Sequence, residues 1–311
     1  MQSLIDRAPV GNHISVCICT YKRPGLLANL LEKLQQQVTN NVFTYSAVIV
    51  DNDVNETAKS VVETYKQKSS FNIQYFVEPE QNISLARNKA VKNAKGNFIA
   101  LIDDDEYPGP TWLLNFYKVL EEVKADGVLG PVVPHYPAGI PKWIIKSKIW
   151  EMNFRKTGTI LNWPETRTSN VFLNGSIFHG QVQPFDPQFG LTGGEDQDFF
   201  KRMMKRGHQF VWCDEAIVYE TVPQERWKKK FYIKKYLQMG GQTGLLARKW
   251  SLAGKCKWLV KSFFATGSYT FVLPFSCLFG QHIFMRCILK GLYFVGWLAG
   301  FLWRPIIRNR Y

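Results

Sequence analysis

The sequence predicts an α/β protein with a mostly parallel sheet and helices on both faces, followed by a helical, apolar and basic C-terminal region. Strand-like and helix-like patterns alternate through the first half, which is typical of parallel strands joined by crossover helices. Polar clusters follow several strands at their carboxyl ends, where such sheets bind ligands. Basic residues gather near the end of the chain, beside long apolar segments. We therefore expect a body over residues 1–223 and a separate C-terminal region over residues 224–311.

The alternation can be followed along the chain. Short apolar runs predict buried strands, and leucines at helical spacing after Pro24 predict the first helix. The predicted strands cover residues 14–19, 45–50, 73–77, 98–102, 127–133 and 170–179. The predicted helices cover residues 24–37, 55–68, 84–94 and 111–124, and a further helix opens at Gly193 and ends near Gly207.

The net charge of +14 is distributed unevenly. Residues 1–223 hold 23 basic and 24 acidic side chains, whereas residues 224–311 hold 16 basic and one acidic, a net charge of +15. Because these basic residues flank apolar, aromatic-rich segments, they favour an anionic membrane surface over nucleic acid as the partner.

The six cysteines contain no C-x-x-C pair, and Cys17 and Cys19 lie within an apolar strand. This usage predicts reduced, buried thiols in a cytosolic protein. The first residues lack the basic-then-apolar pattern of a signal peptide, so we expect no export.

The apolar run 98–102 ends in four consecutive acids, Asp103 to Glu106. Such a density of negative charge is costly unless a cation neutralises it. Mg²⁺ and Mn²⁺ bind carboxylate oxygens and complete their coordination with water and phosphate oxygens. The motif therefore indicates a metal-nucleotide site. A solvated acidic turn before a helix is the alternative, since Pro108-Gly109-Pro110 follow.

The ends of the first two strands are also polar. The stretch from Thr20 to Pro24 has no glycine, which argues against a dinucleotide-binding domain and a sugar nucleotidyltransferase. Asp51, at the next strand end, can accept a hydrogen bond from a base N–H or close an Asx turn.

Two motifs lie at helix N-termini. Arg87 opposes the helix dipole, so a diphosphate or the acids from Asp103 would hold it, unless it is an ordinary surface arginine. Gly193-Gly194-Glu195-Asp196 puts two carboxylates behind a flexible glycine pair, which suits a general base with a substrate close by. Helix capping is the alternative.

Together these motifs resemble the family 2 glycosyltransferases of the GT-A fold, over roughly residues 12–250. The similarity is closest to bacterial succinoglycan-type exopolysaccharide β-glucosyltransferases. The motifs that occur in the family's order and approximate spacing are Thr20 to Pro24, Asp51-Asn52, Asn82 to Asn88, Asp103 to Asp105 and Gly193 to Asp196, and the subgroup's features include Val128 to Val132 and Val222 to Arg226.

The resemblance implies a role for each matching residue. Asp196 would be the catalytic base, Glu195 would orient the acceptor, and Asp105 would ligate Mg²⁺ or Mn²⁺. Asp51 would contact uracil and Arg87 would face the diphosphate. The nucleotide pocket as a whole would comprise Thr20, Tyr21, Arg23, Asp51, Asn52, Arg87, Asp103 and Asp104, with Asp103 touching ribose or the metal through water.

Two departures from the family's pattern stand out. Many relatives carry a histidine metal ligand where this chain has Tyr219-Glu220-Thr221, so Glu220 replaces that ligand or the ligand is absent. Gln224-Glu225-Arg226-Trp227 is one residue shorter than the Q-x-x-R-W of processive synthases, which argues against a long-chain polymerase.

The C-terminal region contains two apolar segments. Ser262 to Met285 has no charged residue across 24 positions, and Gly291 to Trp303 is apolar for 13. Pro274 and the basic residues at both outer ends favour a hairpin over residues 258–303 that re-enters or lies on the cytosolic leaflet, rather than a single crossing. A buried helical subdomain is the alternative. The outer basic residues are Lys255, Lys257 and Lys261 before the segments and Arg304, Arg308 and Arg310 after them.

The resemblance implies an inverting, metal-dependent hexosyltransferase. It would move a sugar, glucose by analogy, from a UDP-sugar to a lipid-linked saccharide in exopolysaccharide, capsule or lipopolysaccharide synthesis. The enzyme would be associated with the cytoplasmic side of the inner membrane and would not bind nucleic acid. The rival functions are a non-catalytic membrane scaffold of the same fold and a sugar nucleotidyltransferase.

Overall fold

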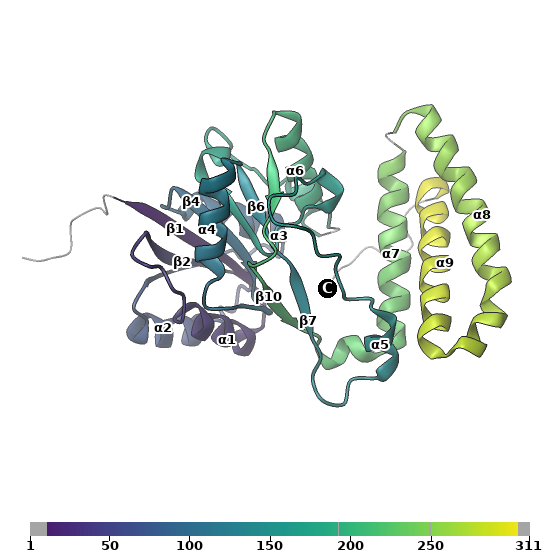
Figure 1. Ribbon diagram of the computed structural model, residues 1–311, viewed down its shortest axis with the longest axis horizontal. Coiled ribbons are helices and arrows are strands. Elements are labelled where there is room, and N and C mark those ends of the chain that lie inside the picture. Colours follow the sequence, from purple (N-terminus) through teal and green to yellow (C-terminus); the bar gives the residue numbers. More distant parts are fainter. Residues whose placement is uncertain (1–10, 192, 249, 304–311) are drawn as a thin grey trace, which may run out of the picture. The chain divides into compact units, whose positions relative to one another are not determined.

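The computed structural model describes residues 11–191, 193–248 and 250–303 (Figure 1). The chain divides into two compact units. Unit 1 comprises residues 1–133 and 152–220, and unit 2 comprises residues 134–151 and 221–311. The C-terminal unit thus begins at residue 221 and includes a second segment from the middle of the chain.

Unit 1 is built on a seven-stranded sheet in the order β3-β2-β1-β4-β8-β6-β9. Its strands are β1 (Asn12–Thr20), β2 (Phe43–Asp51), β3 (Asn72–Val77), β4 (Phe98–Asp103), β6 (Gly127–Leu129), β8 (Val171–Asn174) and β9 (Phe210–Trp212). Only β8 runs against its neighbours β4 and β6 in the described sheet, so the predicted mostly parallel arrangement is confirmed.

Helices cover both faces of this sheet, as predicted. They are α1 (Pro24–Leu34), α2 (Lys59–Lys68), α3 (Ile83–Asn93), α4 (Trp112–Val123) and α6 (Glu195–Lys205), with short 3₁₀ helices η1 (Trp163–Glu165), η2 (Gly175–Phe178) and η3 (Pro187–Phe189). Successive side chains of β1 alternate between the two faces. Ile14, Val16 and Ile18 point into a core with α1, α2 and α4, while Cys17 points into a core with α3 and α6.

The strand predicted over residues 127–133 is two strands. The chain breaks at Gly130, where a Cβ would lie 2.3 Å from the carbonyl oxygen of Ala216, so only glycine allows this approach. After the break it enters a three-stranded sheet in the order β5-β10-β7, with β5 (Glu106–Pro108), β10 (Val218–Thr221) and β7 (Val132–His135). The strand predicted over residues 170–179 is likewise shorter, because η2 follows β8 directly.

Unit 2 is helical. Its helices are α5 (Lys142–Ser147), η4 (Gln224–Trp227), α7 (Lys229–Ala247), α8 (Leu252–Ser276), η5 (Cys277–Phe279) and α9 (Gln281–Leu302). In this unit α9 packs against both α7 and α8. The helix α8, which lies between α7 and α9 in the sequence, runs antiparallel to both (Figure 1). Tyr232, Met285 and Leu289 form part of its buried core together with Trp143 of α5.

The contact between α7 and α9 is made by backbone against backbone. A Cβ on Gly240 would lie 2.0 Å from the carbonyl oxygen of Tyr293, and a Cβ on Gly244 would lie 2.1 Å from that of Trp297. Gly300 approaches the carbonyl oxygen of Gly241 equally closely. Small residues at four-residue spacing thus bring two helices together in the manner common in membrane proteins.

Leu252–Phe279 and Gln281–Leu302 are each long and apolar enough to cross a membrane. Most side chains of α8 are exposed in unit 2, which is not what a buried helical subdomain requires. The flanking Arg304, Arg308 and Arg310 lie outside the described residues. All six cysteines are free thiols, but the prediction that they are buried is wrong for Cys256 and Cys277, which are exposed on α8 and η5.

Candidate active site

The carboxyl ends of β2, β1 and β4 meet at one edge of the sheet in unit 1. In the strand register Thr20 lies opposite Asp51, and Cys19 lies opposite Asp103. The polar clusters that the sequence places after these strands are therefore neighbours, at the edge where open α/β sheets bind ligands.

Asp51 shapes the loop after β2. It is fully buried, and its carboxylate accepts hydrogen bonds from the Asp53 N–H (3.1 Å), the Ala58 N–H (2.8 Å) and the Tyr75 hydroxyl (3.0 Å). The bond from Asp53 closes the Asx turn that was the alternative to a uracil contact.

Asn52 connects the ends of two strands to a helix. Its amide nitrogen donates to the carbonyl oxygens of Glu78 (2.8 Å) and Glu80 (2.6 Å), and its oxygen accepts from the Asn82 N–H (3.0 Å). Asn82 in turn caps α3 by accepting from the N–H groups of Ser84 and Leu85. Asn52 therefore fixes the start of the helix that carries Arg87.

The loop after β1 contacts the acids after β4. The Thr20 hydroxyl donates to Asp104 (2.8 Å), and one Arg23 nitrogen lies 3.1 Å from both Asp104 and Asp105. Tyr21, between them, is partly buried. Burial raises the pKa of Asp104 to about 6, against the lowering effect of Arg23.

More acids lie beside this group. Glu106 of β5 pairs across the strands with Glu220 of β10 and accepts a hydrogen bond from the Asp103 N–H (3.2 Å). Burial raises the pKa of Glu106, and the charges of Asp103, Asp105 and Glu220 raise it further. So dense a group of acids fits a divalent cation.

The described residues contain no group of three or more His, Cys, Asp or Glu side chains that could hold a metal ion alone. This fits Mg²⁺ or Mn²⁺, which keep several water and phosphate ligands and need only one or two carboxylates from the protein. Asp103 and Asp105 are the acids at the edge of the sheet, and Glu220 approaches the group through Glu106.

Arg87 joins the acids after β4 to the start of α6. It is nearly buried, with one nitrogen 2.5 Å from Glu195 and the other 3.6 Å from Asp103. The sequence analysis named a diphosphate or the acids from Asp103 as partners of Arg87, and in the structure Arg87 contacts Asp103. Glu195 is also buried, so this is an ion pair removed from water.

Asp196 lies one residue further along α6, on its first turn. Gly193 and Gly194 precede it with φ of +83° and +101°, a left-handed conformation that explains the glycine pair. Asp196 is partly exposed, whereas Glu195 is committed to Arg87. The helix dipole favours an ionised carboxylate at this position.

Arg167 is a residue that sequence reasoning missed. Its guanidinium donates to the Gly130 carbonyl oxygen (2.7 Å) and lies 5.7 Å from the Trp212 ring. Its Nε is shielded from solvent and has no hydrogen-bond partner among the described residues. Burial lowers the pKa of Arg167 to about 10, although Glu106, Asp196 and Asp103 raise it. Arg167 thus lies within electrostatic reach of the acids after β4 and of Asp196. Its irregular segment gave no motif that could have revealed it.

Known proteins have similar sequences and folds. Succinoglycan biosynthesis protein ExoM of Rhizobium meliloti (strain 1021) is 32% identical over 241 residues, which is 76% of each chain. The dolichyl N-acetyl-α-D-glucosaminyl phosphate 3-β-D-2,3-diacetamido-2,3-dideoxy-β-D-glucuronosyltransferase of Methanococcus voltae is 24% identical over 76% of this chain and 75% of its own. The crystal structure of S. aureus TarS 1-349 in complex with UDP has a TM-score of 0.54 at 18% identity, covering 92% of this chain and 90% of that one.

The likeness to TarS shows that the fold is GT-A, as the motifs implied. Profile matches extend over most of the chain: Glycosyl transferase family 2 covers residues 15–176, and Glycosyl transferase family group 2 covers residues 98–307. On these matches and on the identity to ExoM, the chain belongs to glycosyltransferase family 2.

Proposed function

We propose that this glycosyltransferase moves a hexose, glucose by analogy with the succinoglycan enzymes, from UDP to a lipid-linked saccharide with inversion at the anomeric carbon. The polymer would be an exopolysaccharide, capsule or lipopolysaccharide. One observation carries the proposal: Arg87 contacts Asp103, at the donor edge of the sheet, and Glu195, beside Asp196. Donor and base elements are thereby held in one rigid arrangement.

The donor half of the proposed site lies at the ends of β1, β2 and β4. Uracil would lie against the loop that Asp51 shapes, and the diphosphate would lie beside Asp103 and Asp105. These two acids would hold Mg²⁺ or Mn²⁺, and water and phosphate oxygens would complete the coordination. The bound cation supplies positive charge that stabilises the departing diphosphate. UDP in the TarS structure supports this donor.

Arg23 supplies charge in the same place. Its guanidinium now pairs with Asp104 and Asp105, and its side chain is 45% exposed, so it can turn toward a diphosphate when a cation takes over these acids. Thr20 and Asn52 fix the surrounding loops through hydrogen bonds, and Tyr21 would line the nucleotide pocket.

The acceptor half centres on Asp196. Its carboxylate would remove the proton from the acceptor hydroxyl, which attacks the anomeric carbon opposite UDP, and a single displacement inverts the configuration. Glu195 cannot share this task while it pairs with Arg87, so it orients the start of α6 instead. Arg167, within electrostatic reach of Asp103 and Asp196, would hydrogen-bond the donor sugar.

Unit 2 would bring the enzyme to the cytoplasmic side of the inner membrane. Its net charge of +15 over residues 224–311 and its two long apolar helices support an anionic bilayer as the partner. A lipid-linked acceptor fits this location, and the name of the Methanococcus voltae relative includes a dolichyl phosphate substrate.

The test is release of UDP from a panel of UDP-sugars by the full-length enzyme, with a bacterial membrane extract as acceptor and Mn²⁺ or EDTA present. We expect release with one donor, dependent on both extract and metal. Release of pyrophosphate from a sugar phosphate and UTP would instead identify a nucleotidyltransferase. UDP binding with no turnover on any donor would identify a scaffold.

A further inference from the structure

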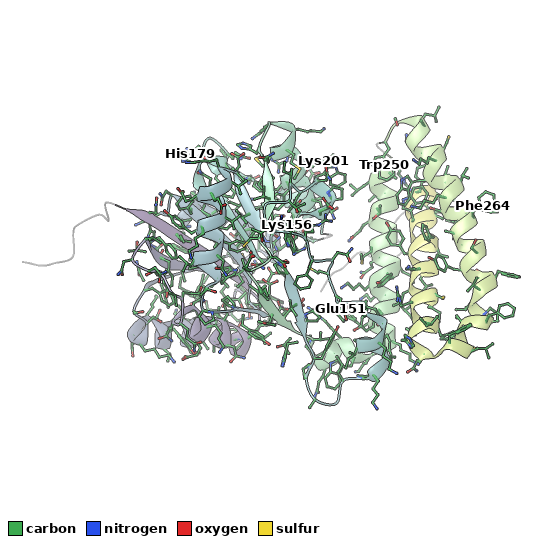
Figure 2. All side chains as sticks on the ribbon, in the orientation of Figure 1. Glu151, Lys156, His179, Lys201, Trp250 and Phe264 are labelled. Atoms are coloured by element: carbon green, nitrogen blue, oxygen red, sulfur yellow. The ribbon has the colours of Figure 1, made fainter. Side chains whose placement is uncertain are left out.

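The outer face of α8 is uncharged along most of its length. Val260, Phe264, Phe271 and Phe275 recur at helical spacing, and Leu278 of η5 continues the row. Between 54% and 79% of each of these side chains is exposed. No charged residue occurs from Ser262 to Phe279. Figure 2 shows Phe264 projecting from the side of α8 that faces away from α9. A soluble helix rarely exposes so continuous an apolar face, so this face has a partner.

Two poses in a bilayer are possible for such a hairpin, and α9 distinguishes between them. Arg286 and Lys290 are exposed on α9, and Gly291 lies against Tyr269 in the middle of α8. Lys290 is also roughly 14 Å along α9 from its start, at 1.5 Å per residue. If the tip at residues 277–280 entered the bilayer first, Lys290 would lie near its centre, which is costly.

The attachment of α7 to α9 adds a second objection to tip-first entry. Gly240 and Gly244 of α7 approach the backbone of α9 at Tyr293 and Trp297, so α7 follows α9 along its length. A crossing α9 would take α7 into the lipid as well. Yet α7 carries four lysines and three glutamines or threonines facing outward or partly exposed: Lys229, Lys230, Lys234, Lys235, Gln238, Gln242 and Thr243.

Polarity in unit 2 instead changes across the bundle. The aromatic face of α8 is on one side, α9 lies in the middle, and α7 with its lysines is on the other side. Arg286 of α9 follows this order, because its charge acts on Tyr236 of α7, where burial raises the pKa of the tyrosine and Arg286 opposes that rise. This order of α8, α9 and α7 is typical of a bundle in which one amphipathic helix, here α8, lies in the plane of the membrane at the boundary of headgroups and acyl chains. The polar helix on the opposite side, here α7, stays in water.

We infer that α8 lies parallel to the membrane surface, with its outer face inserted into an anionic leaflet and α7 remaining in water. Lys257 and Lys261, exposed at the start of the apolar face, would reach lipid phosphates with their ammonium groups while their stems stay on lipid. The inference rests on the membrane association proposed above and specifies its geometry. It excludes both a crossing hairpin and a tip-first re-entrant one.

Spin labels on the full-length protein can measure this geometry. The exposed Cys256 and Cys277 and the partly exposed Cys19 and Cys287 are replaced by serine. Single cysteines are then introduced at Val260, Phe264, Phe271 and Phe275. Depth is read from oxygen and nickel-chelate accessibility on vesicles of phosphatidylcholine with about one third phosphatidylglycerol. These sites extend roughly 22 Å along the helix axis.

We expect all four labels at the same shallow depth, and labels at Lys234 and Lys290 in water. A depth that increases steadily toward Phe275, or a lipid-exposed label at Lys290, would overturn the inference while leaving membrane association intact. If the protein does not bind vesicles and none of its labels contacts lipid, the membrane association in the proposed function is wrong.

A matched pair of variants tests the face itself. Phe271→Glu should weaken vesicle binding by about tenfold or more, since it places a charge at the middle of the inserted face. Val182→Glu changes a side chain that is 91% exposed in unit 1 and should leave binding unchanged. UDP affinity, measured by calorimetry, should be the same in both. Equal vesicle binding by the two variants would contradict the inference.

Discussion

At the scale of single residues, Glu195 and Asp196 are adjacent acids with different environments. Glu195 is buried and paired with Arg87, whereas Asp196 is partly exposed at a helix N-terminus. A general base needs access to the acceptor and freedom to take a proton, and a carboxylate in a buried ion pair has neither. This contrast separates two roles that the Gly-Gly-Glu-Asp motif leaves together.

Asp196→Asn should therefore reduce kcat by about 100-fold or more, the usual contribution of a general base, and leave UDP affinity unchanged. Asp198→Asn is the matched control, because Asp198 lies on the same turn of α6 but pairs with Arg202. Steady-state kinetics and calorimetry measure the two effects. Equal turnover in the Asp196→Asn variant and the wild type would move the base elsewhere.

Arg167→Met should weaken binding of the UDP-sugar by about tenfold or more relative to UDP, since hydrogen bonds to charged groups are among the stronger ones. The difference between the two ligands isolates the sugar from the nucleotide. Arg155→Met is the control, because Arg155 belongs to the same segment but pairs with Glu165. If Arg167→Met weakened UDP and the UDP-sugar equally, Arg167 would act on the diphosphate or on the fold.

The buried pair of Arg87 and Glu195 should show strong coupling in a double-mutant cycle. Arg87→Met leaves the buried Glu195 charge without its arginine and should destabilise the protein by about 3–5 kcal/mol. Glu195→Met should cost less, because Arg87 keeps Asp103, and the double variant should lose less than the sum of the two single losses. Urea unfolding of all four proteins measures the cycle. Additive losses would mean that the two side chains do not depend on each other.

At the scale of elements, α7 and α9 depend on glycine. Gly240→Ala places a methyl group where the Tyr293 carbonyl oxygen already lies, and overpacking of this kind costs about 1–3 kcal/mol. Gly267→Ala is the matched control on α8, because no atom lies within 4 Å of the added Cβ. There alanine should stabilise the helix by up to about 1 kcal/mol. Thermal unfolding followed by circular dichroism in detergent distinguishes the opposite signs.

The elements of the body were predictable because their signals are local. Buried strands have continuous apolar runs, and α1 has leucines on one face, so both kinds of element were found within a few residues of their bounds. The strand over residues 127–133 was not predicted correctly, because the break at Gly130 arises from the approach of Ala216, which is distant in sequence. Local sequence patterns do not predict close contacts between residues that are distant in the sequence.

The candidate site likewise has a part that was predictable from local motifs and a part that was not. Strand ends and helix starts carry short motifs, so Asp103, Arg87 and Asp196 could be named in advance. Their mutual contacts could not, since Arg87 and Glu195 are 108 residues apart. Arg167 had no motif at all, and its position became visible only when its segment was folded against Gly130 and Trp212.

At the scale of the whole molecule, binding of donor and cation should stabilise the fold. UDP with Mn²⁺ at 100 times its Kd should add about 2.7 kcal/mol to the free energy of unfolding, because only the folded chain has the site. EDTA should abolish this increase in the free energy of unfolding, and the Asp105→Ala variant should not show the increase when UDP and Mn²⁺ are added. Glu122→Ala, at an exposed acid on α4, should respond as the wild type does. Differential scanning calorimetry makes the comparison, and an undiminished gain in the Asp105→Ala variant would exclude Asp105 as a ligand.

Arg87 also has a thermodynamic consequence for the order of events in catalysis. A cation beside Asp103 competes with Arg87 for that carboxylate, and Arg87 is the partner that neutralises Glu195 at the start of the base helix. If binding of the donor and cation changes the acceptor affinity by some factor through this arginine, binding of the acceptor must change the donor affinity by the same factor, because coupling between binding sites is reciprocal. In the proposed site, binding of the two substrates would therefore be coupled through one side chain.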